Sequence, residues 1–143
     1  MPLPKREQRL RRRARARTLQ ALYAWDLAPG GGLPRVSEKL WNDLAVGAEE
    51  RALAAPLVAQ FAAHAQEIDA MLADVTANWR FERLGVIERS VLRLGVAELR
   101  VGITPPRVVI QEAVRLAERF GSPDSARFVN GVLDAVARRV GSM

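Results

Sequence analysis

Residues 86–100 constrain the fold of this 143-residue chain more than any other stretch. A helix through these residues is apolar on nearly every side. Other elements have to cover it, because a helix that is apolar all round is buried. Its basic side chains form a single stripe that contains Arg89, Arg93 and Arg100, whereas Glu88 and Glu98 point elsewhere. We therefore expect this helix at the centre of a bundle. Its apolar residues are Val86, Ile87, Val91, Leu92, Leu94, Val96 and Leu99.

The rest of the chain repeats apolar residues at helical spacing, and no segment alternates at period two as a half-buried strand would. Further helices are expected at about residues 5–25, 38–46, 49–78, 105–120 and 124–140, with a short one within 78–84. The predicted fold class is all-α, a compact bundle of about seven helices. Residues 1–143 should form a single domain with one core, divided into an N-terminal subdomain (about 1–78) and a C-terminal subdomain (about 79–143).

Glycine, proline and serine mark the expected helix ends. Residues 29–34 form a Gly/Pro-rich loop that no helix should cross. Ser37 can cap the helix that follows, and Gly121 is expected to take a left-handed conformation at a helix C-terminus. Pro56 predicts either a kink in the long helix or its true start.

The positive charge of the chain is concentrated near its N-terminus. Eight of the 22 basic residues fall between Lys5 and Arg17 with one acid, Glu7, and the rest of the chain carries 14 basic and 15 acidic residues. On a helix this segment has an apolar face for the core and a basic face that should remain free for a polyanion. The alternative is a solvated, partly disordered tail. The basic face contains Arg6, Arg9, Arg13, Arg17 and Gln20, and the apolar face contains Leu10, Ala14, Thr18, Ala21 and Trp25.

Few side chains offer catalytic or metal-binding chemistry. Cysteine is absent and His64 is the only histidine, which excludes thiolate and histidine metal clusters. The glycines at 30–32 lack the lysine and Ser/Thr of a phosphate-binding loop. We therefore expect no enzyme activity, no metal and no cofactor. No run is apolar enough to span a bilayer, and the N-terminal apolar positions continue into the first helix, unlike those of a signal or transit peptide, so the expected location is the cytoplasm.

RNA is the polyanion that the sequence favours. An arginine cluster supplies phosphate contacts, and nearby aromatic or amide side chains supply base stacking and edge recognition. Tyr23 follows the cluster, and Phe128 with Asn130 lies just past an expected helix N-terminus. Phe128 can instead be a core residue. We find no helix-turn-helix spacing that would place a recognition helix on DNA.

Several short stretches also carry a resemblance to a known family. They are Arg-Arg-Arg-Ala-Arg at 11–15, Gln-Ala-Leu-Tyr-Ala-Trp at 20–25, Arg-Ser-Val-Leu-Arg-Leu at 89–94 with Glu-Leu at 98–99, Val-Ile-Gln-Glu-Ala-Val-Arg-Leu-Ala at 109–117 with Phe-Gly at 120–121, Asp-Ser at 124–125, and Phe-Val-Asn-Gly-Val-Leu-Asp at 128–134. In this order they resemble the NusB transcription antitermination family from residue 11 to about residue 138. The stretch at 128–134 is the most specific.

The resemblance implies an all-helical fold of two small bundles without catalytic activity. Family members pair with NusE, the ribosomal protein S10, and bind the boxA element of nascent ribosomal RNA transcripts, within the transcription elongation complex that contains other Nus factors. Homodimerisation is left open. By matched motif, the NusE-facing surface falls to Glu88, Arg89 and Arg93. By the same matching, RNA contact falls to Arg11, Arg12, Arg13, Arg15, Gln20, Tyr23, Asp124 and Phe128.

Two positions depart from the family pattern. Family members often carry a tyrosine where this chain has Ala97, and Gly95 is a helix-weakening residue within the central helix. Both bear on the detail of the NusE-facing surface. Two alternatives remain for the function. One is an RNA-binding fragment of a ribosomal RNA cytosine methyltransferase with a NusB-like domain, and the other is a purely protein-binding helical adaptor with a solubilising arginine tail.

Overall fold

The protein consists of α-helices, and the structure, a computed structural model, describes residues 3–28, 30–77 and 81–141. No strand occurs within these residues, so the all-α prediction is confirmed. The expected count of about seven helices is slightly wrong, because the short helix predicted within 78–84 is a single 3₁₀ turn, and its first residues lie outside the described ones. The elements are α1 (Lys5–Leu27), α2 (Leu33–Asp43), α3 (Ala48–Val75), η1 (Phe81–Arg83), α4 (Val86–Val101), α5 (Pro106–Phe120) and α6 (Pro123–Gly141).

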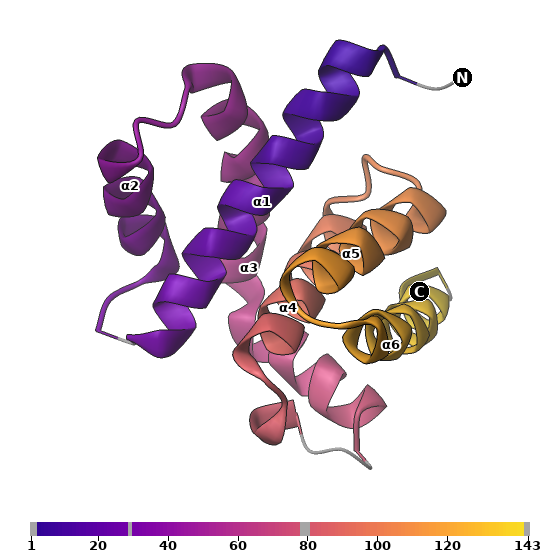
Figure 1. Cartoon of the computed structure of the whole chain (residues 1–143). Helices are drawn as coiled ribbons and strands as arrows, with labels where there is room; N and C mark the ends of the chain where they lie inside the picture. The colour runs from indigo at the N-terminus through magenta and orange to yellow at the C-terminus, as the bar shows by residue number, and fades with distance from the viewer. Residues whose placement is uncertain (1–2, 29, 78–80, 142–143) are drawn as a thin grey trace.

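Helix α4 is the central element, as its sequence predicts. It packs against α1 and α3 on one side and against α5 and α6 on the other (Figure 1). Every residue at positions 90–99 is buried, including Arg93 and Glu98. The apolar ring of α4 is thus covered all round, and its buried charges have to find partners inside the molecule.

The first three helices form one group, in which the long α1 crosses α2 and α3 (Figure 1). Trp41 of α2 is buried and donates a hydrogen bond from Nε1 to the carbonyl of Arg17, 3.2 Å away. Helix α3 is neither kinked at Pro56 nor started there. It begins at Ala48, and its one residue with non-helical backbone angles is His64 (φ −130°, ψ 27°).

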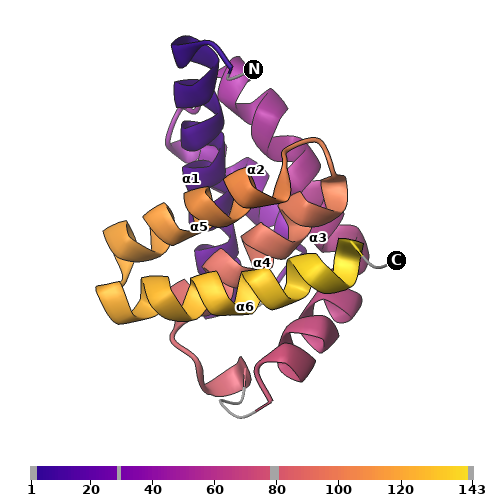
Figure 2. The same cartoon turned by 90° about the vertical axis from the view of Figure 1, so that its right-hand side faces the viewer.

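Helices α5 and α6 run antiparallel as a hairpin beside α4 (Figure 2). Their connection at Gly121 is not left-handed as predicted, because its φ is −118°. The left-handed glycine is Gly102, which ends α4 with φ 77°. Ser37 also differs from its prediction, since it lies inside α2 and donates to the carbonyl of Pro34 at 2.8 Å.

The core of the two helix groups is continuous. Side chains of α1, α3, α4 and α6 belong to one buried cluster, and α3 contacts both α4 and α6. The boundary expected at residues 78 and 79 falls outside the described residues. None of the helices described is both long enough and apolar enough to cross a membrane. The largest fully buried side chains include Leu22, Phe61, Ile68, Leu72, Leu92, Leu94 and Leu133.

Gly95 allows α6 to approach α4 closely. A Cβ atom at position 95 would lie 2.7 Å from Cδ1 of the fully buried Leu133. We predict that Gly95→Ala lowers the free energy of unfolding by about 1–3 kcal/mol, the usual cost of overpacking a core, although alanine is the better helix former. Urea denaturation measures this free energy.

Gly131→Ala is the matched control, because Gly131 lies on exposed α6 surface and a Cβ there meets nothing within 4 Å. It should raise the free energy of unfolding by up to about 1 kcal/mol through helix propensity alone. Equal stabilisation by both substitutions would contradict the role given to Gly95.

Candidate nucleic-acid interface

The arginines of α1 are tied to acidic side chains of the surrounding helices. The expectation that their basic face stays free is therefore wrong in part, since Glu49 and Glu50 of α3 lie against it. These two acids lie in the first turn of α3, where the helix dipole favours negative charge. The ion pairs of the α1 arginines are Arg6–Glu49, Arg11–Glu7, Arg12–Glu112, Arg13–Glu50, Arg15–Glu98, Arg15–Glu112 and Arg17–Glu50.

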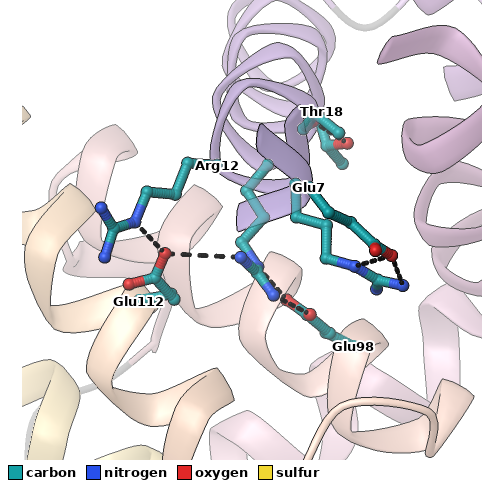
Figure 3. A network of polar contacts seen from close by, with 8 residues as sticks. Glu7, Arg12, Thr18, Glu98 and Glu112 are labelled. Carbon is teal, nitrogen blue, oxygen red and sulfur yellow. Dashed lines mark hydrogen bonds and ion pairs between the residues drawn. The ribbon is translucent and has the colours of Figure 1, made fainter. Parts of the chain in front are cut away.

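Arg15 forms the buried member of this set. Its Nε and Nη2 atoms donate to the two carboxylate oxygens of Glu98 at 2.8 and 2.7 Å, and its Nη1 donates to Glu112 at 3.4 Å. Figure 3 shows Glu98 and Glu112 around this contact, with Arg12 donating to Glu112 from the other side at 2.9 Å. The side chains of Arg15 and Glu98 are only 7% and 8% exposed. The network therefore fixes the middle of α1 to α4 and α5.

The environment of Arg15 keeps its guanidinium charged. Burial alone lowers the pKa of Arg15, but the hydrogen bonds that it donates to Glu98 and the charges of Glu98 and Glu112 together outweigh it, so the pKa lies above its ordinary value. A paired charge of this kind is stable only while both partners are present.

The α1–α5 groove is an open hollow of about 470 Å³ that runs beside this network. It brings three of the predicted RNA-contacting residues, Arg12, Arg13 and Arg15, into one place. Arg12 and Arg13 are exposed, with 44% and 61% of their side chains accessible. The groove is lined by Arg12, Arg13, Arg15, Ala16, Glu112, Arg115, Leu116, Glu118 and Arg119.

A second hollow, the α5–α6 groove, has a volume of about 650 Å³ and continues from the first. The two grooves share Arg12, Glu112, Arg115 and Glu118, so they form one path across α5. Arg115 and Arg119 were not among the residues predicted to contact RNA, because the spacing of residues on a helix does not show which helix lies opposite. The second groove is lined by Arg12, Gln111, Glu112, Val114, Arg115, Glu118, Pro123, Ala126, Arg127 and Asn130.

The other predicted RNA-contacting residues lie outside these grooves. Arg11 is partly buried and bonded to Glu7, and Gln20 is exposed and accepts a hydrogen bond from Arg17 at 3.2 Å. Tyr23 is 38% exposed at the far end of α1. In the first turns of α6, Asp124 is exposed and paired with Arg127, whereas Phe128 is half-buried against the core.

Two of the residues predicted to face a protein partner are held inside the molecule. Arg89 donates to Asp26 at 2.9 and 3.0 Å. Arg93, only 8% exposed, pairs with Asp26 and Asp69. Glu88 is half-buried in the first turn of α4. The guanidinium of Arg93 also lies 5.2–5.7 Å from the rings of Trp25, Phe61 and Phe81.

These contacts join α4 to the end of α1 and to α3. In the described part of the chain, no three acidic or histidine side chains are close enough to hold a metal ion.

The two grooves present arginine and amide side chains along one path, and this arrangement favours binding of an anionic polymer.

Comparison with known proteins shows one family. A model described as the NusB family matches residues 12–138. The transcription antitermination protein NusB of Anaeromyxobacter dehalogenans is 43% identical over 128 residues, which cover 89% of each chain. The protein of the same name from Bacillus mycoides is 38% identical over 127 residues, or 88% of this chain and 95% of the relative. A crystal structure of the antitermination factors NusB and NusE in complex with dsRNA contains a chain that is 31% identical, with a TM-score of 0.82 over 92% of this chain and 98% of that one.

Removal of the Arg15 charge should destabilise the fold. We predict that Arg15→Met lowers the free energy of unfolding by about 3–5 kcal/mol, because it leaves the carboxylate of Glu98 buried without its partner. The double variant Arg15→Met with Glu98→Met should recover much of this loss, since Arg12 still pairs with Glu112. Chemical denaturation measures all variants.

Arg9→Ala is the control, because Arg9 is exposed on the same helix. Its stability should equal that of the unaltered protein. An Arg15→Met variant as stable as Arg9→Ala would show that the buried network does not hold α1 in place.

Proposed function

The chain belongs to the NusB family, and from this premise we propose that it is a transcription antitermination factor that binds boxA-type RNA of ribosomal RNA operons together with NusE. One observation carries the proposal, namely the arginine-lined path that starts between α1 and α5. Relatives named as transcription antitermination proteins and a related chain solved with NusE and RNA support it. We propose a binding role without catalysis, exercised in the cytoplasm within the elongation complex that contains the other Nus factors.

The exposed arginines of α1 are the proposed phosphate contacts. The side chains of Arg12 and Arg13 are exposed, whereas their partners Glu112 and Glu50 are largely buried. Glu112 also pairs with Arg15, and Glu50 also pairs with Arg17. Arg12 and Arg13 can therefore turn to phosphates without leaving either carboxylate unpaired. Arg11, Gln20 and Tyr23 would extend the contact along the same helix.

Arg15 has a different part in this proposal. Because its guanidinium is buried against Glu98 and Glu112, we propose that it supports RNA binding by holding α1 in position beside α5. Asp124 and Phe128 are proposed to contact RNA at the first turns of α6. Residues 1–143 would act as one RNA-binding domain with subdomains at about 1–78 and 79–143.

The NusE-facing surface is proposed at the start of α4. Glu88 lies in the first turn of this helix, and its carboxylate oxygens lie close to Gly85, where a Cβ would be 2.9 Å from Oε2. Arg89 and Arg93 pair with Asp26, and we propose that they hold the surface against the end of α1. Part of the partner contact would then depend on residues that do not touch NusE.

The proposal predicts RNA binding that is specific, strengthened by NusE and sensitive to salt. Arg12→Ala with Arg13→Ala should weaken boxA binding and make the plot of log affinity against log salt less steep by about 1.4, because each phosphate contact on single-stranded RNA contributes about 0.7. Fluorescence anisotropy with labelled boxA RNA, with and without NusE, measures both quantities.

Circular dichroism and NusE binding of the same variant serve as controls and should be unchanged. If boxA and scrambled RNA bind equally well in the presence of NusE, the sequence-specific part of the function is wrong. If neither RNA binds while NusE still does, the chain acts as a protein-binding adaptor.

A charge reversal tests the partner surface separately. We predict that Glu88→Arg weakens NusE binding by about tenfold or more, because it reverses a charge at the edge of the proposed interface. RNA binding in the absence of NusE should be unchanged. Isothermal titration calorimetry with purified NusE measures the affinity. Glu38→Arg, on the exposed surface of α2, is the matched control. Equal affinities for the two variants would exclude Glu88 from the interface.

A further inference from the structure

The outer face of α5 carries an unassigned run of cationic surface. Arg115 and Arg119 lie one helical turn apart on this helix, and both line the α1–α5 groove. The combined lining of the two grooves contains six arginines and two glutamates. One of these glutamates, Glu112, is already bonded to Arg12 and Arg15. The path therefore has a clear positive excess that continues beyond α1.

Neither α5 arginine is firmly held by the protein. Arg115 is 60% exposed, and its Nε lies 3.8 Å from the nearest Glu112 oxygen, at the far limit of an ion pair. Arg119 is exposed, and its guanidinium lies 5.1 Å from the centre of the Phe120 ring. Both cations can therefore turn to an incoming anion without breaking a buried contact.

An exposed aromatic side chain adjoins Arg119. Phe120 ends α5 and is 42% exposed, whereas Phe128 on α6 is half-buried against the core. An exposed phenyl ring beside a guanidinium offers a surface on which a nucleobase can stack. Protein interfaces also bury aromatic rings, so the ring alone does not select the ligand. The excess of six arginines over two glutamates along the path favours a polyanion, and the ring adds a base-stacking contact that RNA can use.

We propose that Arg115 and Arg119 bind consecutive phosphates of the RNA as it crosses α5, and that Phe120 stacks on one of its bases. Helix α5 is joined to α1 by the ion pairs of Glu112 with Arg12 and Arg15, and it packs against α6 (Figure 2), so these residues would connect the arginines of α1 with the first turns of α6. The inference rests on the proposed function, because it takes RNA as the ligand of the path. It adds three contact residues on a helix to which no contact has been assigned.

The test compares two double variants of the full chain in the presence of NusE. Arg115→Ala with Arg119→Ala should weaken boxA binding about tenfold, and it should make the salt dependence less steep by about 1.4, as two phosphate contacts require. Arg35→Ala with Lys39→Ala removes the same charge from exposed positions on α2, on the other side of α1, and should bind nearly as tightly as the unaltered protein (Figure 1).

Three single variants test the remaining parts. Phe120→Ala should weaken binding about fivefold or more through lost stacking, and Phe120→Tyr should restore it. Glu118→Gln, which removes a negative charge from the path, should tighten binding by about twofold. Thermal melting of each variant shows whether the fold is intact.

The outcomes separate this inference from the proposed function. If the unaltered protein binds boxA and Arg12→Ala with Arg13→Ala weakens it, but the α5 variant binds as tightly as the α2 control, only the α5 contacts are wrong. If the α5 variant loses NusE binding instead of RNA binding, the face is a protein-binding surface and the inference is overturned. If the unaltered protein binds no RNA, both proposals fail.

Discussion

The bidentate ion pair between Arg15 and Glu98 determines where α1 lies on the bundle. Both side chains are almost fully buried, so each charge depends on the other for its stability. A shift of α1 by one residue would separate them and leave two unpaired charges in the interior. The pair thereby sets the register of α1 against α4, and with it the position of every other arginine on α1 relative to α5. The groove exists because this register is fixed.

The acidic side chains around α1 offset part of its positive charge but leave some of its arginines available to a polyanion. Glu50 and Glu112 each contact more than one arginine, so the cluster is less repulsive within the folded protein than its sequence suggests. The outer pairs have exposed arginines that can change partner, whereas in the Arg15–Glu98 pair both side chains are buried and loss of either one is costly. One row of arginines can therefore hold the helix in place through some members and offer others to a polyanion.

The sequence predicted the fold better than the site. The burial of α4 followed from its apolar ring, and the ranges of α5 and α6 followed from the helical spacing of their apolar residues. Predictions of local backbone structure were wrong where tertiary contacts decide it. The backbone of α3 departs from helical geometry at His64 and not at Pro56. Gly121 allows a close approach of neighbouring atoms and does not form a left-handed turn. In the site, the helical spacing of residues could not show that α1 lies opposite Arg115. Arg15 looked like its neighbours, because only the position of Glu98 in space distinguishes it.

Two separate contacts fix α1 to α4, and this matters for binding. Arg15 joins its middle to the last turn of α4 through Glu98, and Asp26 joins its end to the first turns of α4 through Arg89 and Arg93. A helix held at two points cannot tilt, so the arginines beside α5 keep their spacing before any ligand arrives. Such preorganisation removes part of the ordering cost of association. Arg89 and Arg93 of the central helix therefore contribute to the affinity of a groove that neither of them lines.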